Sequence, residues 1–332
     1  MVLHERYLGA VLAALTLWGC GGAQGEETDD GAKMATSTSV VSGEVRRALF
    51  NDPRFQRGVK VLSPTAQPAV VEGSLQLTAA NGPPTMALAQ WWSTQSILPG
   101  QPDTLASGAR RWSNHYKWVV LGPVGSTDGD VDLYCDGIAE WNGAWRTRTE
   151  HWPHLLVQES AVIAGQPFLN QTQRLDFIVD LNLKRISENR EPGYSPSLHA
   201  GEFVIYFTVQ NRSGGAGTSD FFWFGLKPYD TRNAKPGLYQ AFDRGTGKYT
   251  YNIGVPFWSR GMSPSEWRHV QVDLLPYIKR GFAEARAAGA LRDSGDLADY
   301  KIGGFNMGWE MTGHVSGEMQ IKNFSLSSVS SQ

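Results

Sequence analysis

The stretch GEFVIYFTVQNR, residues 201–212, alternates bulky apolar side chains with more polar ones. The apolar set is Phe203, Ile205, Phe207 and Val209. Because successive side chains of a β-strand point to opposite faces, this spacing predicts a strand with one face in an apolar core. The other face would carry a set polar enough to line a groove: Glu202, Val204, Tyr206, Thr208 and Gln210.

Segments of the same kind follow one another from about residue 58 onward. Clear examples are AVVEGSLQLTA (69–79), YKWVVLGPV (116–124), QRLDFIVDLNLKRIS (173–187) and DFFWFGLKPYD (220–230). Gly, Pro, Asn and Asp separate them, as they separate the strands of a sandwich. Neither an internal repeat nor a second linker divides the chain, so we predict a single all-β sandwich domain over residues 45–332. Residues 42–55 are expected to form a short helix or turn at its start.

One segment has helical periodicity instead. In residues 273–300 the apolar residues recur three or four positions apart, at Leu274, Ile278, Phe282 and Ala285. Pro276 suits a first helical turn, and Gly289 suits a helix end. The predicted fold class is therefore an all-β sandwich with one or two peripheral helices.

The N-terminus predicts where the protein is located. An apolar run over residues 7–18 is too short to span a bilayer and is typical of a secretory signal peptide. It ends in Leu17-Trp18-Gly19-Cys20, which resembles the bacterial lipobox. This resemblance implies that Cys20 is lipidated and becomes the mature N-terminus. The alternative is an ordinary signal peptide that contains a cysteine.

Residues 20–44 are mostly small, polar and acidic, as expected of a flexible tether. We therefore expect a signal peptide at residues 1–19, a tether at residues 20–44, and a domain held at the cell envelope by a lipid anchor in the membrane. Gly21 after the cysteine favours the outer membrane or the cell surface. Only Cys135 remains in the mature chain, so no internal disulfide can form.

The bulk composition narrows the function. Over 332 residues the formal net charge is −2, which excludes the basic surface that nucleic-acid binding requires. The 12 Trp, 11 Tyr and 14 Phe are enough to stack on sugar faces as well as to fill a core. Large β-sandwich cores also use many aromatic residues, which is the simpler explanation.

The C-terminal third carries a resemblance to known proteins. EWRHVQVDLLPYI is followed by YKIGGFNMGWE and then by GEMQIKNFSLSSV. Over about 65 residues, this order resembles the closing part of galactose-binding-like and concanavalin-like jelly-roll carbohydrate modules. The matching residues are Trp267, Val270, Val272, Asp273, Leu274, Ile302, Phe305, Met319, Ile321, Phe324 and Leu326. The resemblance implies a jelly roll and names no ligand, because such folds host many functions.

Carboxylates are the candidate catalytic groups. No G-x-S-x-G elbow, P-loop, dinucleotide fingerprint or H-E-x-x-H motif occurs. Glycoside hydrolysis needs two carboxylates, about 5–5.5 Å apart for retention or about 6.5–9.5 Å for inversion. The candidates are Glu159, Asp230 and Glu310. The absence of the E-x-D-x-E signature of laminarinase-like jelly rolls disfavours this chemistry.

A ligand groove is predicted from two segments that place a ring beside a charge. Trp309 precedes Glu310, and Tyr229, Asp230 and Arg232 follow the FFWFG strand. A ring can take the apolar face of a sugar while a carboxylate binds its hydroxyl groups, and a buried Glu310 could act as a general acid. Asp230 and Arg232 could also simply pair with each other.

The segment EHWPHLLVQES offers further polar residues. If it is extended, His154, Leu156 and Gln158 lie on one face and Glu159 lies on the other. His154 and Gln158 could then line a cleft. The alternative is that both are satisfied edge groups.

Tyr206 and Gln210, followed by Arg212, resemble the residue types of jelly-roll polysaccharide lyases. In those enzymes a Tyr or His removes the C5 proton while an Arg or Gln neutralises the uronate. The order of residues in the lyase motifs is not reproduced here.

One acidic stretch, DGDVDLYCDG at residues 128–137, resembles the start of a calcium loop. Its acids are Asp128, Asp130, Asp132 and Asp136. Leu133 stands where such a loop needs Gly, and no Glu closes it. A structural Ca²⁺ is one interpretation and a loop of solvated acids is the other. No other cofactor is expected.

Together these patterns favour an extracytoplasmic, lipid-anchored β-sandwich that binds an oligo- or polysaccharide. The alternative is a polysaccharide-degrading enzyme on the same fold, either a glycoside hydrolase or a polysaccharide lyase. A structural envelope lipoprotein without a sugar ligand is the third hypothesis.

Overall fold

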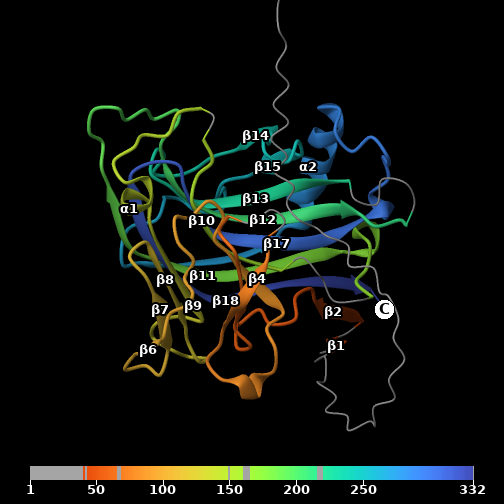
Figure 1. Ribbon diagram of the computed structural model, residues 1–332. Helices are drawn as coiled ribbons and strands as arrows, with labels where there is room; N and C mark the ends of the chain where they lie inside the picture. The colour runs from red at the N-terminus through yellow and green to blue at the C-terminus, as the bar shows by residue number, and fades with distance from the viewer. Residues whose placement is uncertain are drawn as a thin grey trace, which may run out of the picture.

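The computed structural model describes residues 40–41, 43–65, 69–148, 150–159, 165–214 and 220–331. Two stacked β-sheets dominate this part of the chain (Figure 1), which confirms the predicted β-sandwich. The predicted signal peptide and nearly all of the predicted tether lie outside the described residues. No helix among the described residues has the length and apolar character needed to cross a membrane.

The first sheet, sheet A, is built around one long strand. In spatial order it contains β1 (Val40–Val41), β2 (Glu44–Ala48), β18 (Val315–Ser331), β9 (Val131–Asp136), β8 (Lys117–Leu121), β7 (Arg110–Ser113) and β6 (Asp103–Thr104). On its other edge β18 pairs with β11 (Arg174–Glu188), which pairs in turn with β16 (Trp267–Asp273). Residues 44–48 are therefore a strand, and the expected helix or turn at 42–55 is wrong there.

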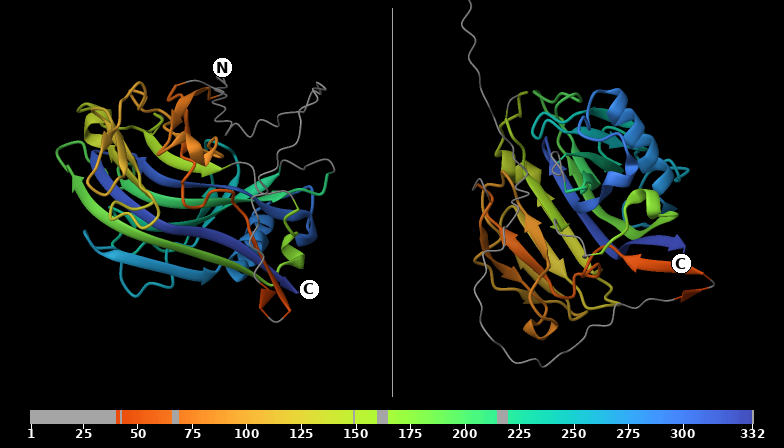
Figure 2. Two further views of the ribbon diagram at one scale, coloured as in Figure 1. Left: turned by 90° about the horizontal axis from the view of Figure 1, so that it is seen from below. Right: turned by 90° about the vertical axis from the view of Figure 1, so that its right-hand side faces the viewer.

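The second sheet, sheet B, contains the GEFVIYFTVQNR strand at its centre. Its spatial order is β14 (Tyr239–Phe242), β15 (Tyr249–Asn252), β13 (Phe221–Asp230), β12 (Gly201–Asn211), β17 (Tyr300–Met311), β10 (His154–Glu159), β5 (Met86–Ala89), β3 (Val59–Leu62) and β4 (Val71–Leu75). The long strands bend as they cross the molecule (Figure 2). Some neighbouring strands in this sheet come from distant parts of the chain, as β12 and β17 do, while others, such as β12 and β13, follow one another.

Two helices accompany the sheets, as predicted. α1 (Gly137–Trp141) is short, and α2 (Leu275–Ala287) lies beside β15 and β13 (Figure 1). Ile278, Phe282 and Ala285 of α2 are buried, so the predicted apolar stripe faces the core. Short 3₁₀ turns occur at η1 (Ala79–Asn81), η2 (Leu169–Gln171) and η3 (Leu297–Asp299).

The core lies between the two sheets. The apolar set of β12 is fully buried there and belongs to the same cluster as Phe177 of β11 and Phe324 of β18. The Phe207 and Phe177 rings meet edge to face at 5.6 Å. Burying a side chain of this size stabilises the fold by about 1.5–3 kcal/mol. Because one face of sheet B is used in this way, its polar residues are left on the outer face.

Candidate functional site

The outer face of sheet B brings polar residues from three neighbouring strands into two rows. Register places His154 of β10 opposite Glu310 of β17, and Glu310 opposite Glu202 of β12. We call this set the acidic row. A second row lies four positions away along each strand. It consists of Gln158, Asn306 and Tyr206, and we call it the amide row. Cα atoms of such partners lie about 4.5–5.5 Å apart. The prediction that His154, Leu156 and Gln158 share a strand face is confirmed.

A small apolar floor separates the two rows. Ala89, Leu156 and Val204 are buried together on this outer face, apart from the main core. Gly308 lies between Leu156 and Val204 in the register. A Cβ at Gly308 would lie only 2.1 Å from the Leu155 carbonyl oxygen, so glycine is required there. The floor is thus flat and apolar, with polar groups on both sides.

Glu310 is a partly buried carboxyl group in the middle of the acidic row. Its side chain is 21% exposed, and its Oε2 accepts a hydrogen bond from the Trp152 Nε1 at 3.3 Å. His154 Nε2 lies 3.9 Å from the same oxygen. Burial raises the pKa of Glu310 above its usual value, although Lys227 and the Trp152 hydrogen bond partly offset this. A carboxyl group in such a place can hold a proton nearer to neutral pH than an exposed one.

His154 is enclosed by two tryptophan rings. The Trp152 ring stacks on it with centroids 5.4 Å apart, and the Trp91 ring meets it edge-on at 5.7 Å. Burial lowers the pKa of His154 to about 4, so the imidazole is neutral at pH 7. Within the described part of the chain, its Nδ1 is buried and has no hydrogen-bond partner. Hydrogen bonds of the imidazole with the Trp152 and Trp91 backbones oppose the effect of burial on the pKa of His154 without cancelling it.

Glu202 belongs to a cluster of four charges. Its carboxylate is 2.7 Å from the Lys227 ammonium group and also pairs with Arg232. Arg232 holds Asp230 as well, at 2.8 Å, and Asp230 is only 3% exposed. Asp230 and Arg232 thus pair with each other, which was the simpler alternative. Two cations beside it favour the ionised form of Glu202.

The amide row is also enclosed. The Tyr206 ring lies over Gly225 of β13, where a Cβ would be 2.3 Å from a ring carbon. Burial raises the pKa of Tyr206 above its usual range, so the hydroxyl group keeps its proton at pH 7. Among the described residues, Asn306 Oδ1 and Thr208 Oγ1 are buried without a hydrogen-bond partner. Buried polar atoms of this kind are uncommon and need an explanation.

Aromatic side chains line the edges of the face. The Arg146 guanidinium lies 4.6 Å from the Trp152 ring centroid, and Trp92 stacks on His151 at 3.8 Å. On the other side of the rows, the Trp223 ring meets Tyr206 at 6.1 Å. Tyr239 of β14, next to Lys227, is 53% exposed. Rings therefore flank the floor on both sides.

The predicted groove needs correction at Trp309 and Tyr229. Trp309 is fully buried, and its Nε1 donates to the Leu133 carbonyl oxygen of sheet A at 3.0 Å. Its ring packs edge to face against Phe203 at 5.3 Å and Tyr229 at 6.2 Å. Strand alternation sends Trp309 into the core and the adjacent Glu310 outward. Trp309 and Tyr229 therefore do not line the outer face.

Three other predicted residues lie away from the two rows. Glu159 is 3% exposed on the inner face of β10 and accepts a hydrogen bond from Asn51 at 2.8 Å, so it cannot pair with Glu310. Gln210, which is 4% exposed, pairs in register with Lys301 at the far end of sheet B. Arg212 follows beyond that end. The lyase-like grouping of Tyr206 with Gln210 and Arg212 is therefore not formed.

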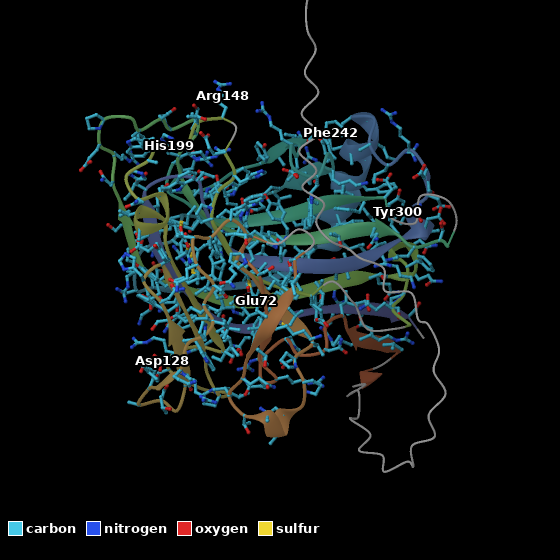
Figure 3. The ribbon with its side chains drawn as sticks, viewed as in Figure 1. Glu72, Asp128, Arg148, His199, Phe242 and Tyr300 are labelled. Carbon is cyan, nitrogen blue, oxygen red and sulfur yellow. The ribbon has the colours of Figure 1, made fainter. Side chains whose placement is uncertain are left out.

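The predicted calcium loop is not assembled either. Asp128 accepts from the Ser107 hydroxyl, Asp130 binds Arg54 at 2.5 Å, and Asp136 caps α1 through the Ala139 amide at 3.1 Å. Figure 3 shows Asp128 at the lower edge of the molecule. Among the described residues, no group of three or more His, Cys, Asp or Glu side chains is placed to hold a metal ion.

Sequence reasoning missed three residues of the face as site residues: Glu202, Asn306 and Trp152. Glu202 was visible as the first polar member of the alternating β12 pattern. Asn306 and Glu310 lie four residues apart on one strand, a spacing that places both on the same face. Trp152 comes from a loop, and its contact with Glu310 joins residues 158 positions apart. No pattern in the sequence signals that contact.

Comparison with known proteins gives only distant similarity. No protein-family model matches the sequence, and no curated protein is similar to it. A family 12 xyloglucanase from Bacillus licheniformis has 13% identity and a TM-score of 0.39, over 73% of this chain and 100% of that one. Endoglucanase Cel12A from Rhodothermus marinus has 11% identity and a TM-score of 0.37, over 70% and 97%.

A family 11 xylanase from Neocallimastix patriciarum has 8% identity and a TM-score of 0.35, over 69% of this chain and 94% of that one. Similarity at this level identifies neither a family nor an activity for this chain. The function must be argued from the outer face of sheet B.

Proposed function

We propose that the outer face of sheet B binds a glycan chain, and that the protein recognises an oligo- or polysaccharide. The observation that carries this proposal is the pair of polar rows, with aromatic rings at the edges of the face. A pyranose ring has an apolar face and a rim of hydroxyl groups. The rings at the edges suit the apolar face and the two rows suit the hydroxyl groups, while Ala89, Leu156 and Val204 are buried beneath Trp91 and Tyr206.

Unused hydrogen-bonding atoms support the same proposal. His154 Nδ1, Asn306 Oδ1 and Thr208 Oγ1 are buried without partners in the described part of the chain. Leaving a buried polar atom unpaired costs about 1–3 kcal/mol. Sugar hydroxyl groups both donate and accept, so they can satisfy these atoms. A ligand would thereby relieve a cost that the free protein bears.

The charges on the face favour a neutral glycan. Glu310 and Glu202 lie in adjacent register positions, so a uronate carboxylate bound there would lie beside two carboxyl groups. The nearby cations Lys227 and Arg232 already pair with Glu202 and Asp230. A lyase needs a free cation or amide to neutralise the uronate, and these two cations are occupied. The face therefore suits neutral sugars better than polyuronates.

Hydrolysis is a second candidate, favoured by the pairing of Glu310 with Glu202. The two carboxyl groups have different environments: burial raises the pKa of Glu310, while Glu202 forms ion pairs with Lys227 and Arg232. Such a pair is the usual basis for assigning an acid and its ionised partner. Glu310 would protonate the leaving oxygen. Glu202 would serve as nucleophile or base.

Location remains a separate proposal that rests on the N-terminal sequence. We infer that Cys20 is lipidated and that residues 20–44 hold the domain at the outer membrane or cell surface. Replacing Cys20 with Ser should move the protein from the membrane fraction to the soluble fraction. Unchanged fractionation would contradict the lipid anchor.

Binding can be tested by calorimetry with neutral and uronate-containing oligosaccharides on one panel. We expect neutral chains to bind and Trp152→Ala to weaken them. The matched control is Trp267→Ala, which removes a ring that is 39% exposed on β16 of sheet A. Equal loss in both variants, or no binding by any neutral glycan, would contradict the proposal.

Hydrolysis is tested separately with reducing-sugar release. If Glu310 is the acid, Glu310→Gln should lower kcat by about 10²–10⁴-fold with little change in KM. Glu284→Gln, on the exposed side of α2, is the control. If the protein binds glycans but releases no reducing sugar under any condition, hydrolysis is contradicted and glycan recognition stays as the proposed function.

A further inference from the structure

A second region of interest lies at the other end of β17. Tyr300 starts this strand, and Figure 3 shows it on the opposite side of the molecule from His199, which precedes β12 near the acidic row. Lys301 and Glu310 are nine residues apart on β17, which corresponds to about 30 Å along a strand. Here the chain crosses from β10 to β11 through η2.

An open pocket of about 470 Å³ lies at this end. Its polar and cationic lining includes Arg47, Gln171, Lys301, Ser330 and Ser331, and the Phe168 ring forms part of its wall. None of the described residues that line it has a carboxylate side chain. At about 30 Å³ per water molecule, it has room for an anion together with the group that carries it.

The cations of the pocket are held in place by neutral partners. The Lys301 ammonium donates to the Gln166 carbonyl oxygen at 2.7 Å and lies 4.0 Å from the Phe168 ring centroid. The Arg47 guanidinium donates to the Gly165 carbonyl oxygen at 3.0 Å. These contacts orient both groups without neutralising their charge. Each side chain keeps further donors for a ligand.

The positive charge of this region is not balanced locally. Within the described residues, Lys301, Arg47 and Arg212 form no ion pair. Burial, together with the nearby Arg212, lowers the pKa of Lys301, so the two cations repel each other. The neighbouring Arg46 and Arg174 differ, because Asp176 pairs with both. The internal segments outside the description, such as 160–164 and 215–219, contain no acidic residue.

We propose that this pocket is a binding site for a phosphate group, separate from the outer face of sheet B. Two cationic donors, with polar atoms of Gln171, Ser330 and Ser331 around the same space, match a tetrahedral oxyanion, which accepts several hydrogen bonds at once. The phosphate could be free or could belong to a lipid headgroup. A lipid source is considered because Arg47 lies on β2, which follows the proposed lipid anchor and tether in the sequence.

Phosphate titration monitored by calorimetry is the direct test. Inorganic phosphate should bind the full-length chain, and both Lys301→Gln and Arg47→Gln should weaken it by about tenfold or more, as expected for loss of a charge-assisted hydrogen bond. Lys279→Gln on α2 removes an exposed charge elsewhere and should leave the affinity within twofold. Two variants from different strands guard against misfolding of either one.

The titration also needs a control for competition by the chain's own acids. Glu26, Glu27, Asp29 and Asp30 precede β2 in the sequence. The titration should therefore be repeated with these four residues replaced by their amides. The site is supported if either protein binds phosphate and the Lys301→Gln substitution abolishes that binding. The site is overturned if neither protein binds phosphate. It is also overturned if neither Lys301→Gln nor Arg47→Gln weakens the binding.

Vesicles distinguish the two sources of phosphate. A chain carrying Cys20→Ser should float with phosphatidylglycerol vesicles and not with phosphatidylcholine vesicles if the source is an anionic lipid, and Lys301→Gln should abolish flotation. Binding of inorganic phosphate without flotation identifies a soluble phosphate. Glycan binding on sheet B should be unchanged in Lys301→Gln, so failure of either proposal can be recognised independently.

Discussion

The two faces of sheet B are built from the same strands and differ in the kinds of side chain that they carry. On the inner face of β17, Trp309 is fully buried and its indole Nε1 has a partner in sheet A. On the outer face, one residue later, Glu310 is enclosed by aromatic rings, and its neighbour His154 keeps an unpaired nitrogen. Burial alone therefore does not distinguish core from site. The kinds of side chain do, because the inner face carries rings and apolar chains and the outer face carries polar groups that meet in rows.

The largest expected effect is on the inner face. Trp309→Ala should lower the free energy of unfolding by about 3–5 kcal/mol, because it leaves a large cavity between the sheets. Trp152→Ala, which removes a ring from the outer face, should cost much less. Chemical denaturation of both variants measures the difference. Similar losses would mean that the outer-face rings are part of the core.

The next effect is a pH dependence that belongs to the outer face. Burial lowers the pKa of His154 to about 4 from an ordinary 6.5, so the unfolded chain binds the proton more readily. Stability should therefore fall as pH drops from about 6.5 to about 4, by roughly 3 kcal/mol in total. Above pH 6.5 this contribution is complete.

His154→Gln tests that effect, because glutamine cannot titrate. The difference in unfolding free energy between this variant and the unchanged protein should shift by about 3 kcal/mol between pH 7 and pH 4. The exposed His115→Gln is the control. A difference that stays constant with pH would show that His154 is better solvated than its position between Trp152 and Trp91 implies.

Glu310 should show the opposite sign. Its pKa is raised in the folded protein, so the charged form is disfavoured there, and stability is lost as pH rises through the folded pKa. Glu310→Gln should consequently be more stable than the unchanged protein at pH 7, with the advantage shrinking as the pH falls from the folded pKa towards 4.5 and lost below that value. Denaturation at pH 4 and pH 7 measures this. A destabilised variant at pH 7 would mean that the carboxylate is needed by its neighbours.

The smallest effect is on affinity. Aromatic contacts add about 0.5–1.5 kcal/mol beyond area burial, so Trp152→Ala should weaken glycan binding about two- to tenfold. Tyr239→Ala, on the far side of the rows, should have a smaller effect because its ring is 53% exposed. Calorimetry with one oligosaccharide compares the loss of affinity in the two variants. A larger loss at Tyr239 would place the main sugar contact at β14.

Strand alternation explains which site predictions held. The periodicity of EHWPHLLVQES put His154 and Gln158 on one face, and β10 confirms that placement. The same rule separates Trp309 from Glu310, so a groove that used both side chains could not form. Glu159 was wrongly grouped with Glu310 for the same reason, because its side chain lies on the inner face of β10. Residues two or four apart on a strand were predictable as partners, whereas adjacent ones were wrongly grouped.

The sequence by itself determined that this chain is a β-sandwich with peripheral helices, because period-two alternation and the helical stripe of residues 274–285 are local properties of hydrophobic burial. Only the tertiary structure decided which polar residues meet. Glu202, Glu310 and His154 are neighbours through the register of β12, β17 and β10, strands that are far apart in the chain. Register depends on non-local hydrogen bonds and on core packing between sheets, and neither has a signature in any short stretch of sequence.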